Sequence, residues 1–337
     1  MEEKKGERNI YRANLRGTPF NLECDSTTVF QDSRGLYLVN RTEQGELPKI
    51  AVYSNNIPGA YELALLSVWD WGTDIATHYD KPGDAPSKEA TVMVNIANPF
   101  NEPRIHKNFP GGPAELEVYR QEVVDGIHDH WIDPMAGKWT YTYHERLFNY
   151  NPSRNLKSTD RGLLLPKGVN QIELIVDDLQ RDITSKGAQA TTWMPSADPG
   201  LESNRPCMQR LWFRVLEDKN QELKMNMNCY FRSRDLYKAW FMNVYALTSL
   251  QKKVAEMVSD RLKKEVRVNG YTDTSDSLHI YGAYFKEFEQ HLKPMRSDEK
   301  FERRVVISGT PMHESFQEMT EETRKKLAEN PDYMKTK

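Results

Sequence analysis

One of the three cysteines in the sequence, Cys207, stands where a thiol could react. It follows Pro206 directly and precedes a predicted strand from Met208 to Leu216. A cysteine at a loop–strand junction can be partly exposed, and its thiolate is a nucleophile once nearby cations lower the thiol pKa from about 8.5. The alternative interpretation is a buried, unreactive side chain, which is the commoner role of a lone cysteine.

Two further segments carry polar side chains that could meet a ligand. Arg232-Ser233-Arg234-Asp235 lies between a predicted strand and a predicted helix, where Ser233 could cap the helix and an arginine could bind an anion. His279 and Tyr281 stand two residues apart on one face of a predicted strand and could hydrogen-bond a ligand hydroxyl. The alternatives are a capped helix with solvated charges and polar side chains satisfied at a strand end.

Three histidines lie close together in the sequence and raise the question of a metal. They are His128, His130 and His144. Their spacing matches no standard zinc set, and no cysteine pair supports one. We therefore expect no metal.

The composition limits the class of protein. The chain has 337 residues, with 46 Lys and Arg against 49 Asp and Glu, for a net charge of −3. That balance argues against binding nucleic acid by bulk charge. The mean hydropathy is −0.75, and no run approaches the roughly 18 apolar residues of a membrane span. The first residues lack the apolar core of a secretory signal, and three cysteines are too few for a disulfide scaffold, so we expect a cytoplasmic protein.

Helices and strands that could position these side chains alternate irregularly along the chain. Pro113 and Gly126 bound one predicted helix, and apolar and polar residues alternate from Leu223 to Phe231 as in a strand. The irregular order favours an α+β fold with a mixed sheet. No glycine-rich dinucleotide or phosphate-loop motif occurs. The predicted helices are 61–77 (interrupted near Gly72), 113–125, 170–183 and 236–262, and the predicted strands are 90–96, 208–216, 222–231 and 266–281.

Taken in order, these segments resemble the thymidylate synthase family, which includes pyrimidine nucleotide hydroxymethylases. The resemblance covers roughly residues 60–285 and is closest to the shorter archaeal-type members. It implies a three-layer α+β fold with a large mixed, twisted sheet covered by helices. We expect an N-terminal extension of short strands and loops (1–59), a catalytic domain (60–310) and a charged C-terminal tail (311–337). The motifs are Tyr141-Thr-Tyr143-x-Glu-Arg-Leu147, Asn170-Gln-Ile-x-x-Ile-Val-x-x-Leu, Pro206-Cys207, Arg232-Ser233-x-Asp235, Asn243 and Asp276-Ser-Leu-His279-Ile-Tyr281.

In that family a cysteine thiolate adds to C6 of the pyrimidine of a nucleoside monophosphate, and C5 then attacks the methylene of 5,10-methylenetetrahydrofolate, the co-substrate. The resemblance also implies a homodimer and requires no metal. A glutamate from the helix before the active-site tyrosine is expected, and we choose Glu122 over Glu115 and Glu117. The other implied roles are Cys207 as nucleophile, Arg232 and Ser233 at the phosphate, Asp235 near O2, Asn243 at the pyrimidine edge, His279 and Tyr281 at the sugar 3′-hydroxyl, and Tyr143 in removal of the C5 proton.

The sequence departs from the family pattern in ways that bear on activity. Met208 stands where the synthases have His after the cysteine, and Phe231 where they have Gln. Ser185-Lys186-Gly187 replaces the arginine pair that crosses from the partner subunit, so Lys186, Arg104 or Lys107 are expected at the phosphate. An apolar C-terminal tail that would close the site is not evident, and this favours addition of water over hydride.

We therefore expect a deoxyuridylate hydroxymethylase. The Asn243 amide can donate to O4 and accept from N3–H, which matches uracil, whereas Asp at this position would favour cytosine. The alternatives are a thymidylate synthase, a cytidylate hydroxymethylase acting on CMP or dCMP, and a nucleotide-binding protein that has lost turnover. The choice between ribose and deoxyribose stays open.

Overall fold

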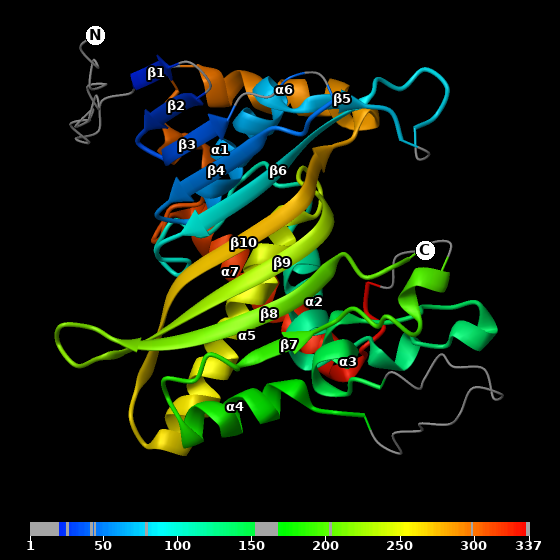
Figure 1. Ribbon diagram of the computed structural model, residues 1–337, viewed down its shortest axis with the longest axis vertical. Coiled ribbons are helices and arrows are strands. Elements are labelled where there is room, and N and C mark those ends of the chain that lie inside the picture. The colour runs from blue at the N-terminus through cyan, green and yellow to red at the C-terminus, as the bar shows by residue number, and fades with distance from the viewer. Residues whose placement is uncertain are drawn as a thin grey trace, which may run out of the picture.

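One mixed β-sheet runs through the molecule and carries helices on one face (Figure 1). The computed structural model describes residues 20–24, 27–40, 43, 45–77, 80–151, 168–201, 204–297 and 299–334. Residues 1–19 of the predicted N-terminal extension and residues 335–337 of the predicted tail lie outside this part. Among the described residues the sheet has ten strands in the order β1-β2-β3-β4-β6-β10-β9-β8-β7, with β5 paired to β6.

The sheet is mixed because two neighbouring pairs are parallel, β4 with β6 and β9 with β10, and the other pairs are antiparallel. The strands are β1 (Phe20–Cys24), β2 (Thr27–Asp32), β3 (Gly35–Asn40), β4 (Lys49–Ser54), β5 (Thr73–Ile75), β6 (Ser87–Ile96), β7 (Gln189–Thr191), β8 (Met208–Glu217), β9 (Leu223–Asp235) and β10 (Val266–Ile280). Strands β1–β4, which lie within the predicted extension, thus continue the same sheet as β6.

The helices form two layers behind the sheet. They are α1 (Ile57–Trp71), α2 (Pro113–Asp125), α3 (Tyr143–Phe148), α4 (Gln171–Arg181), α5 (Trp240–Leu262), α6 (Phe285–Arg296) and α7 (Pro311–Glu329). Helices α1 and α5 pack on the strands, α2 packs on α5, and α7 packs on α2. The predicted α+β fold, a large mixed sheet covered by helices, is confirmed.

Local signals explain where several elements begin and end. Pro113 occupies the first turn of α2, where its missing N–H costs nothing, and Gly126 ends the helix with φ 70°. A Cβ at Gly126 would lie 2.2 Å from His144 Nδ1, so only glycine fits there. The Asn170 side chain caps α4 by accepting the Glu173 N–H at 3.0 Å.

Helix α5 begins later than the sequence pattern predicts. The pattern placed its start at Leu236, but the helix begins at Trp240, because the Leu236 N–H still donates to His279 O at 2.8 Å. Strand β9 also runs on to Asp235, so the prediction that Ser233 caps the helix was wrong. This extension keeps the polar end of β9 inside the sheet.

A buried charge cluster ties the N-terminal strands and the C-terminal segment to α1. Glu62 is fully buried and accepts hydrogen bonds from Arg34 at 2.7 Å, from Arg304 at 2.7 and 2.9 Å, and contacts His106 at 2.9 Å. Burial alone would raise the pKa of Glu62, but the hydrogen bonds from Arg304 and His106 and the charge of Arg34 lower it to about 2.

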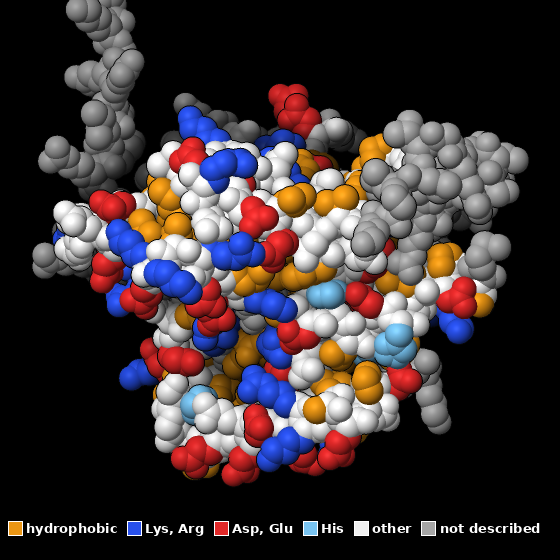
Figure 2. Space-filling view, turned by 90° about the horizontal axis from the view of Figure 1, so that it is seen from below, with side chains coloured by type: hydrophobic (Ala, Val, Ile, Leu, Met, Phe, Trp, Pro, Cys, Tyr) orange, Lys and Arg blue, Asp and Glu red, His pale blue; other side chains and the backbone are white. Residues whose placement is uncertain are grey.

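The surface seen from below the view of Figure 1 mixes basic and acidic side chains without a large area of one sign (Figure 2). Within the described ranges, none of the helices combines the length and the apolar character that crossing a bilayer requires. In the predicted C-terminal tail, helix α7 packs on α2 and buries Thr323 and Leu327.

Candidate functional site

Cys207 lies at the start of β8, directly beside an arginine. The Arg232 guanidinium places Nη2 3.8 Å from Cys207 Sγ and also donates to the carbonyls of Pro206 and Arg205, each at 3.0 Å. Backbone pairing fixes this arrangement, because the Arg232 N–H donates to Cys207 O at 2.9 Å. The cysteine is half-buried, and burial raises the pKa of its thiol, while the charges of Arg232 and Arg234 oppose that rise.

The tyrosine segment, Tyr141 to Leu147, packs against the same junction. Tyr143 accepts a hydrogen bond from the Met208 N–H at 3.2 Å, one residue beyond the cysteine. The Tyr141 ring lies with its centroid 5.7 Å from that of Tyr143. Burial raises the pKa of both phenols, so both hydroxyls stay protonated at neutral pH and can donate hydrogen bonds.

A buried ion pair holds the loop that leads to the cysteine. Arg146, on α3, donates to Asp198 at 2.8 Å and to Thr192 O at 3.1 Å. Asp198 also accepts the Met194 N–H at 2.6 Å. Because Arg146 and Asp198 have side chains only 2% and 0% exposed, this pair links the tyrosine segment firmly to the loop before Cys207.

Parallel pairing brings the ends of β9 and β10 together. In this register Ser233 lies opposite Ser277, and Asp235 lies opposite His279. The Asp235 carboxylate accepts the Lys238 N–H at 2.9 Å, and burial raises its pKa to about 6 against that hydrogen bond.

His279 is a buried, neutral imidazole at this strand end. Its ring centroid lies 4.5 Å from that of Tyr281, and Nδ1 lies 3.2 Å from Ser277 Oγ. Nε2 is buried without a hydrogen-bond partner among the described residues. Burial lowers the pKa of His279 to about 4, so the ring offers an uncharged hydrogen-bonding edge to a ligand.

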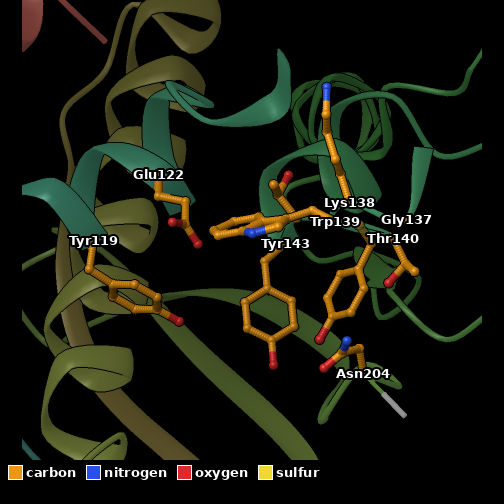
Figure 3. Close-up of a pocket in the computed structure, with 10 residues that line it drawn as sticks. Tyr119, Glu122, Gly137, Lys138, Trp139, Thr140, Tyr143 and Asn204 are labelled. Atoms are coloured by element: carbon orange, nitrogen blue, oxygen red, sulfur yellow. The ribbon is translucent and has the colours of Figure 1, made fainter. Parts of the chain in front are cut away.

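Between α2 and the tyrosine segment lies a cavity of about 430 Å³ (Figure 3). Tyr119 and Glu122 enter it from α2, one helical turn apart. Asn243, in the first turn of α5, donates to the Tyr119 hydroxyl at 2.6 Å. The lining residues are Tyr119, Glu122, Gly137, Lys138, Trp139, Thr140, Tyr141, Thr142, Tyr143 and Asn204.

The three histidines that raised the question of a metal point to different partners. His128 Nδ1 lies 2.8 Å from Glu122 Oε2, His144 Nδ1 lies 2.7 Å from Asp129 Oδ2, and His130 contacts Asp332 of the C-terminal segment. In the part of the chain that the structure describes, no three His, Cys, Asp or Glu side chains gather as a metal would require.

The three predicted phosphate-binding cations, Lys186, Arg104 and Lys107, have partners other than Cys207. The Lys186 carbonyl accepts a hydrogen bond from the indole N–H of Trp212. At the usual rise per residue of a strand, Trp212 lies about 16 Å from Cys207 along β8. Arg104 is stacked over Phe100 and Tyr245, with its guanidinium carbon 4.1 and 4.5 Å from the ring centroids, and lines a different cavity beside α7. Lys107 donates to Arg303 O at 2.8 Å.

Several residues of this site were not among those predicted from the sequence. Tyr119, Trp139 and Asn204 line the cavity, and His128 contacts Glu122. Tyr119 could have been found, since it lies three residues before Glu122 and therefore on the same helix face. No sequence signal pointed to Asn204. The site thus offers a carboxylate and neutral phenols that line one aromatic cavity, an amide bound to the Tyr119 phenol, and a thiol beside a cation next to the residue that Tyr143 contacts.

Residues 116–323 match the family model described as thymidylate synthase, which covers more than half of the chain. A protein of Methanosarcina acetivorans is 29% identical over 231 residues, which are 68% of this chain and 88% of that protein. A protein of Methanosarcina mazei is 29% identical over 245 residues, 72% and 92% of the two chains. A protein of Methanothermobacter marburgensis is 34% identical over 214 residues, 63% and 76% of the two chains. All three bear the name "Putative thymidylate synthase".

Proposed function

Because this chain belongs to the thymidylate synthase family, we propose that it transfers one carbon to C5 of a pyrimidine nucleoside monophosphate, with dUMP as the substrate and hydroxymethylation as the outcome. The observation that carries this proposal is the contact between Arg232 Nη2 and Cys207 Sγ at 3.8 Å, one residue before Met208, whose N–H donates to Tyr143 of the aromatic cavity. A cation beside a thiol stabilises the thiolate, and the same cation can pair with a phosphate.

Cys207 then adds through Sγ to C6 of the ring, and the electron pair moves to C5 and O4. After C5 has bonded to the methylene carbon, loss of the C5 proton and departure of tetrahydrofolate leave an exocyclic methylene on the ring. Water then adds to that carbon and loses a proton, and expulsion of Sγ from C6 restores the C5–C6 double bond. Arg232 and Ser233 bind the phosphate. Since Lys186 is remote from Cys207 within this chain, the remaining phosphate cation comes from a second copy in a homodimer.

Asn243 selects uracil in this proposal. Its amide nitrogen already gives one proton to the Tyr119 hydroxyl at 2.6 Å, which fixes the orientation of the amide. The second N–H then donates to O4, and Oδ1 accepts from N3–H. Asp235 binds the base near O2, and His279 and Tyr281 hold the 3′-hydroxyl at the paired strand ends.

Proton movement falls to Glu122 and Tyr143, which face the same cavity (Figure 3). The cavity suits a flat co-substrate, because Trp139 and three tyrosines form its walls. Methylenetetrahydrofolate supplies the methylene group when it is bound. The residues of this chain orient it, and Tyr143, with a raised phenol pKa, holds a water at C5 by donating a hydrogen bond.

Hydroxymethylation is favoured over reductive methylation because Trp139, which forms one wall of the cavity, is 41% exposed. Water therefore has access to the reacting carbon. Reductive methylation of dUMP is the second candidate. It is favoured by the name that the relatives share, "Putative thymidylate synthase".

The test combines the enzyme with labelled methylenetetrahydrofolate and dUMP, UMP, dCMP or CMP, and identifies the product by mass. Hydroxymethyl-dUMP is the expected product, whereas dTMP with dihydrofolate would establish the synthase and a labelled cytidylate would reassign the base. Cys207→Ser should bind dUMP and yield no product. Full activity of Cys207→Ser would refute the mechanism, and nucleotide binding by wild type without turnover would identify a binding protein.

A further inference from the structure

We propose that His128 is a positioning residue for Glu122: its imidazole holds one carboxylate oxygen of Glu122 so that the other oxygen serves the proton transfer at C5. This inference rests on the proposed function, because it concerns the same cavity. It gives a role to a histidine that had suggested only a metal.

The contact is direct and shielded from water. His128 Nδ1 lies 2.8 Å from Glu122 Oε2, and the two side chains are 3% and 16% exposed. Glu122 lines the cavity, and His128 lies behind it. With its proton on Nδ1, the imidazole donates to Oε2 and leaves Oε1 for the cavity.

The His128 ring is itself fixed. It stacks on Trp131 with centroids 3.6 Å apart and planes 11° apart, and it meets Trp139 edge-on at 6.0 Å. The Trp131 indole N–H in turn donates to Asp332 of the C-terminal segment. A ring stacked on one indole, with a second indole packed edge-on beside the stack, has little freedom to rotate, so its hydrogen bond fixes the rotamer of Glu122.

The remaining nitrogen strengthens the case for a specific role. His128 Nε2 is buried without a hydrogen-bond partner among the described residues, which costs free energy. A phenyl ring would fill the same stacked position without that cost. The imidazole is therefore retained for Nδ1, the nitrogen that meets Glu122.

Two variants separate the hydrogen bond from the packing. His128→Phe keeps the stack on Trp131 and removes the donor, whereas His128→Asn places an amide N–H close to the position of Nδ1. The readouts are tritium release from C5-labelled dUMP, the dissociation constant of dUMP and the melting temperature. We expect His128→Phe to lower kcat about 10- to 100-fold, as for a misplaced proton acceptor, with dUMP affinity within about threefold. His128→Asn should regain most of the rate.

A third variant tests whether the effect passes through the carboxylate. Glu122→Gln removes the proton acceptor, so adding His128→Phe to Glu122→Gln should cost nothing further. The inference is overturned if His128→Phe keeps wild-type kcat, if His128→Asn is as slow as His128→Phe, or if the double variant loses more than Glu122→Gln alone. If wild type itself releases no tritium in a Cys207-dependent way, the proposed function fails and this inference falls with it.

Discussion

Replacing Asp235 by Asn should stabilise the protein at neutral pH while it reduces activity. Burial raises the pKa of Asp235 from 3.8 to about 6, although hydrogen bonds from the Lys238 and Tyr237 N–H groups oppose this. The folded protein therefore binds this proton more tightly than the unfolded chain does. Wild type loses the corresponding stability as the pH rises from about 4 to about 6, and the loss is complete at pH 7.

The size of the effect follows from the shift. A rise of roughly two units in the pKa of Asp235 lowers the free energy of unfolding at neutral pH by about 3 kcal/mol. This value is an upper bound, because Asp235 is only partly buried. With an unfolding entropy of about 2.1 cal/mol/K per residue, a chain of 337 residues gains about 4 °C in melting temperature. In Asp235→Asn, Oδ1 can still accept the Lys238 N–H, so the local turn is kept.

Urea unfolding at about pH 4 and about pH 7.5 measures this directly. Asp235→Asn should gain stability only at the higher pH, and turnover of dUMP should fall because the base loses a charged partner. Asp218→Asn is the matched control. The Asp218 side chain is 29% exposed, and hydrogen bonds from the Glu222 and Asn220 N–H groups lower its pKa, so its removal should destabilise the protein slightly at the higher pH. Equal or lower stability of Asp235→Asn at the higher pH would refute the reasoning.

Three further outcomes follow from the same site. Burial raises the pKa of the Cys207 thiol, so its alkylation by iodoacetamide should accelerate with pH. The Arg232 guanidinium, 3.8 Å from Sγ, opposes the rise in pKa. Arg232→Gln should therefore slow alkylation about fivefold, the factor for about 1 kcal/mol between close charges. Mass spectrometry gives the rates, and equal rates in both proteins would contradict this. Burial lowers the pKa of His279 to about 4, so the unfolded chain binds this proton more tightly than the folded protein does. The free energy of unfolding should therefore fall by up to about 3 kcal/mol as the pH is lowered from about 6.5 to about 4. His279→Asn should lose this pH dependence in urea unfolding. Arg146→Met should lower the free energy of unfolding by about 3–5 kcal/mol, because it leaves Asp198 buried without its partner. Combining Arg146→Met with Asp198→Leu should restore most of this stability. A double variant as unstable as Arg146→Met alone would contradict the importance of the ion pair.

Several elements of the fold were readable from short stretches of sequence. Proline and glycine mark both ends of α2, because one has no N–H to lose and the other accepts φ 70°. Alternation of buried residues marks β9 from Leu223 to Phe231. These signals act within a few residues, so they predict where a helix or strand lies in the sequence. They do not predict which other elements it packs against.

The same local reasoning failed where a long-range contact decided the outcome. The pattern extended α5 back to Leu236, yet the Leu236 N–H pairs with His279, over 40 residues later in the chain. Ser233, expected as a helix cap, belongs to the sheet for the same reason. Strand pairing can override a helix-start signal, because it satisfies the same backbone groups.

The order of residues along the chain already specifies the chemical groups and their succession: a thiol before a strand, Arg232 at the end of the next strand, an amide on the following helix and His279 beyond it. Which of these groups come into contact depends on how the strands and helices pack. The parallel register of β9 and β10 sets Asp235 opposite His279, and the turn after α2 returns His128 to Glu122. Such contacts depend on packing between segments whose separation in sequence carries no information on their distance in space.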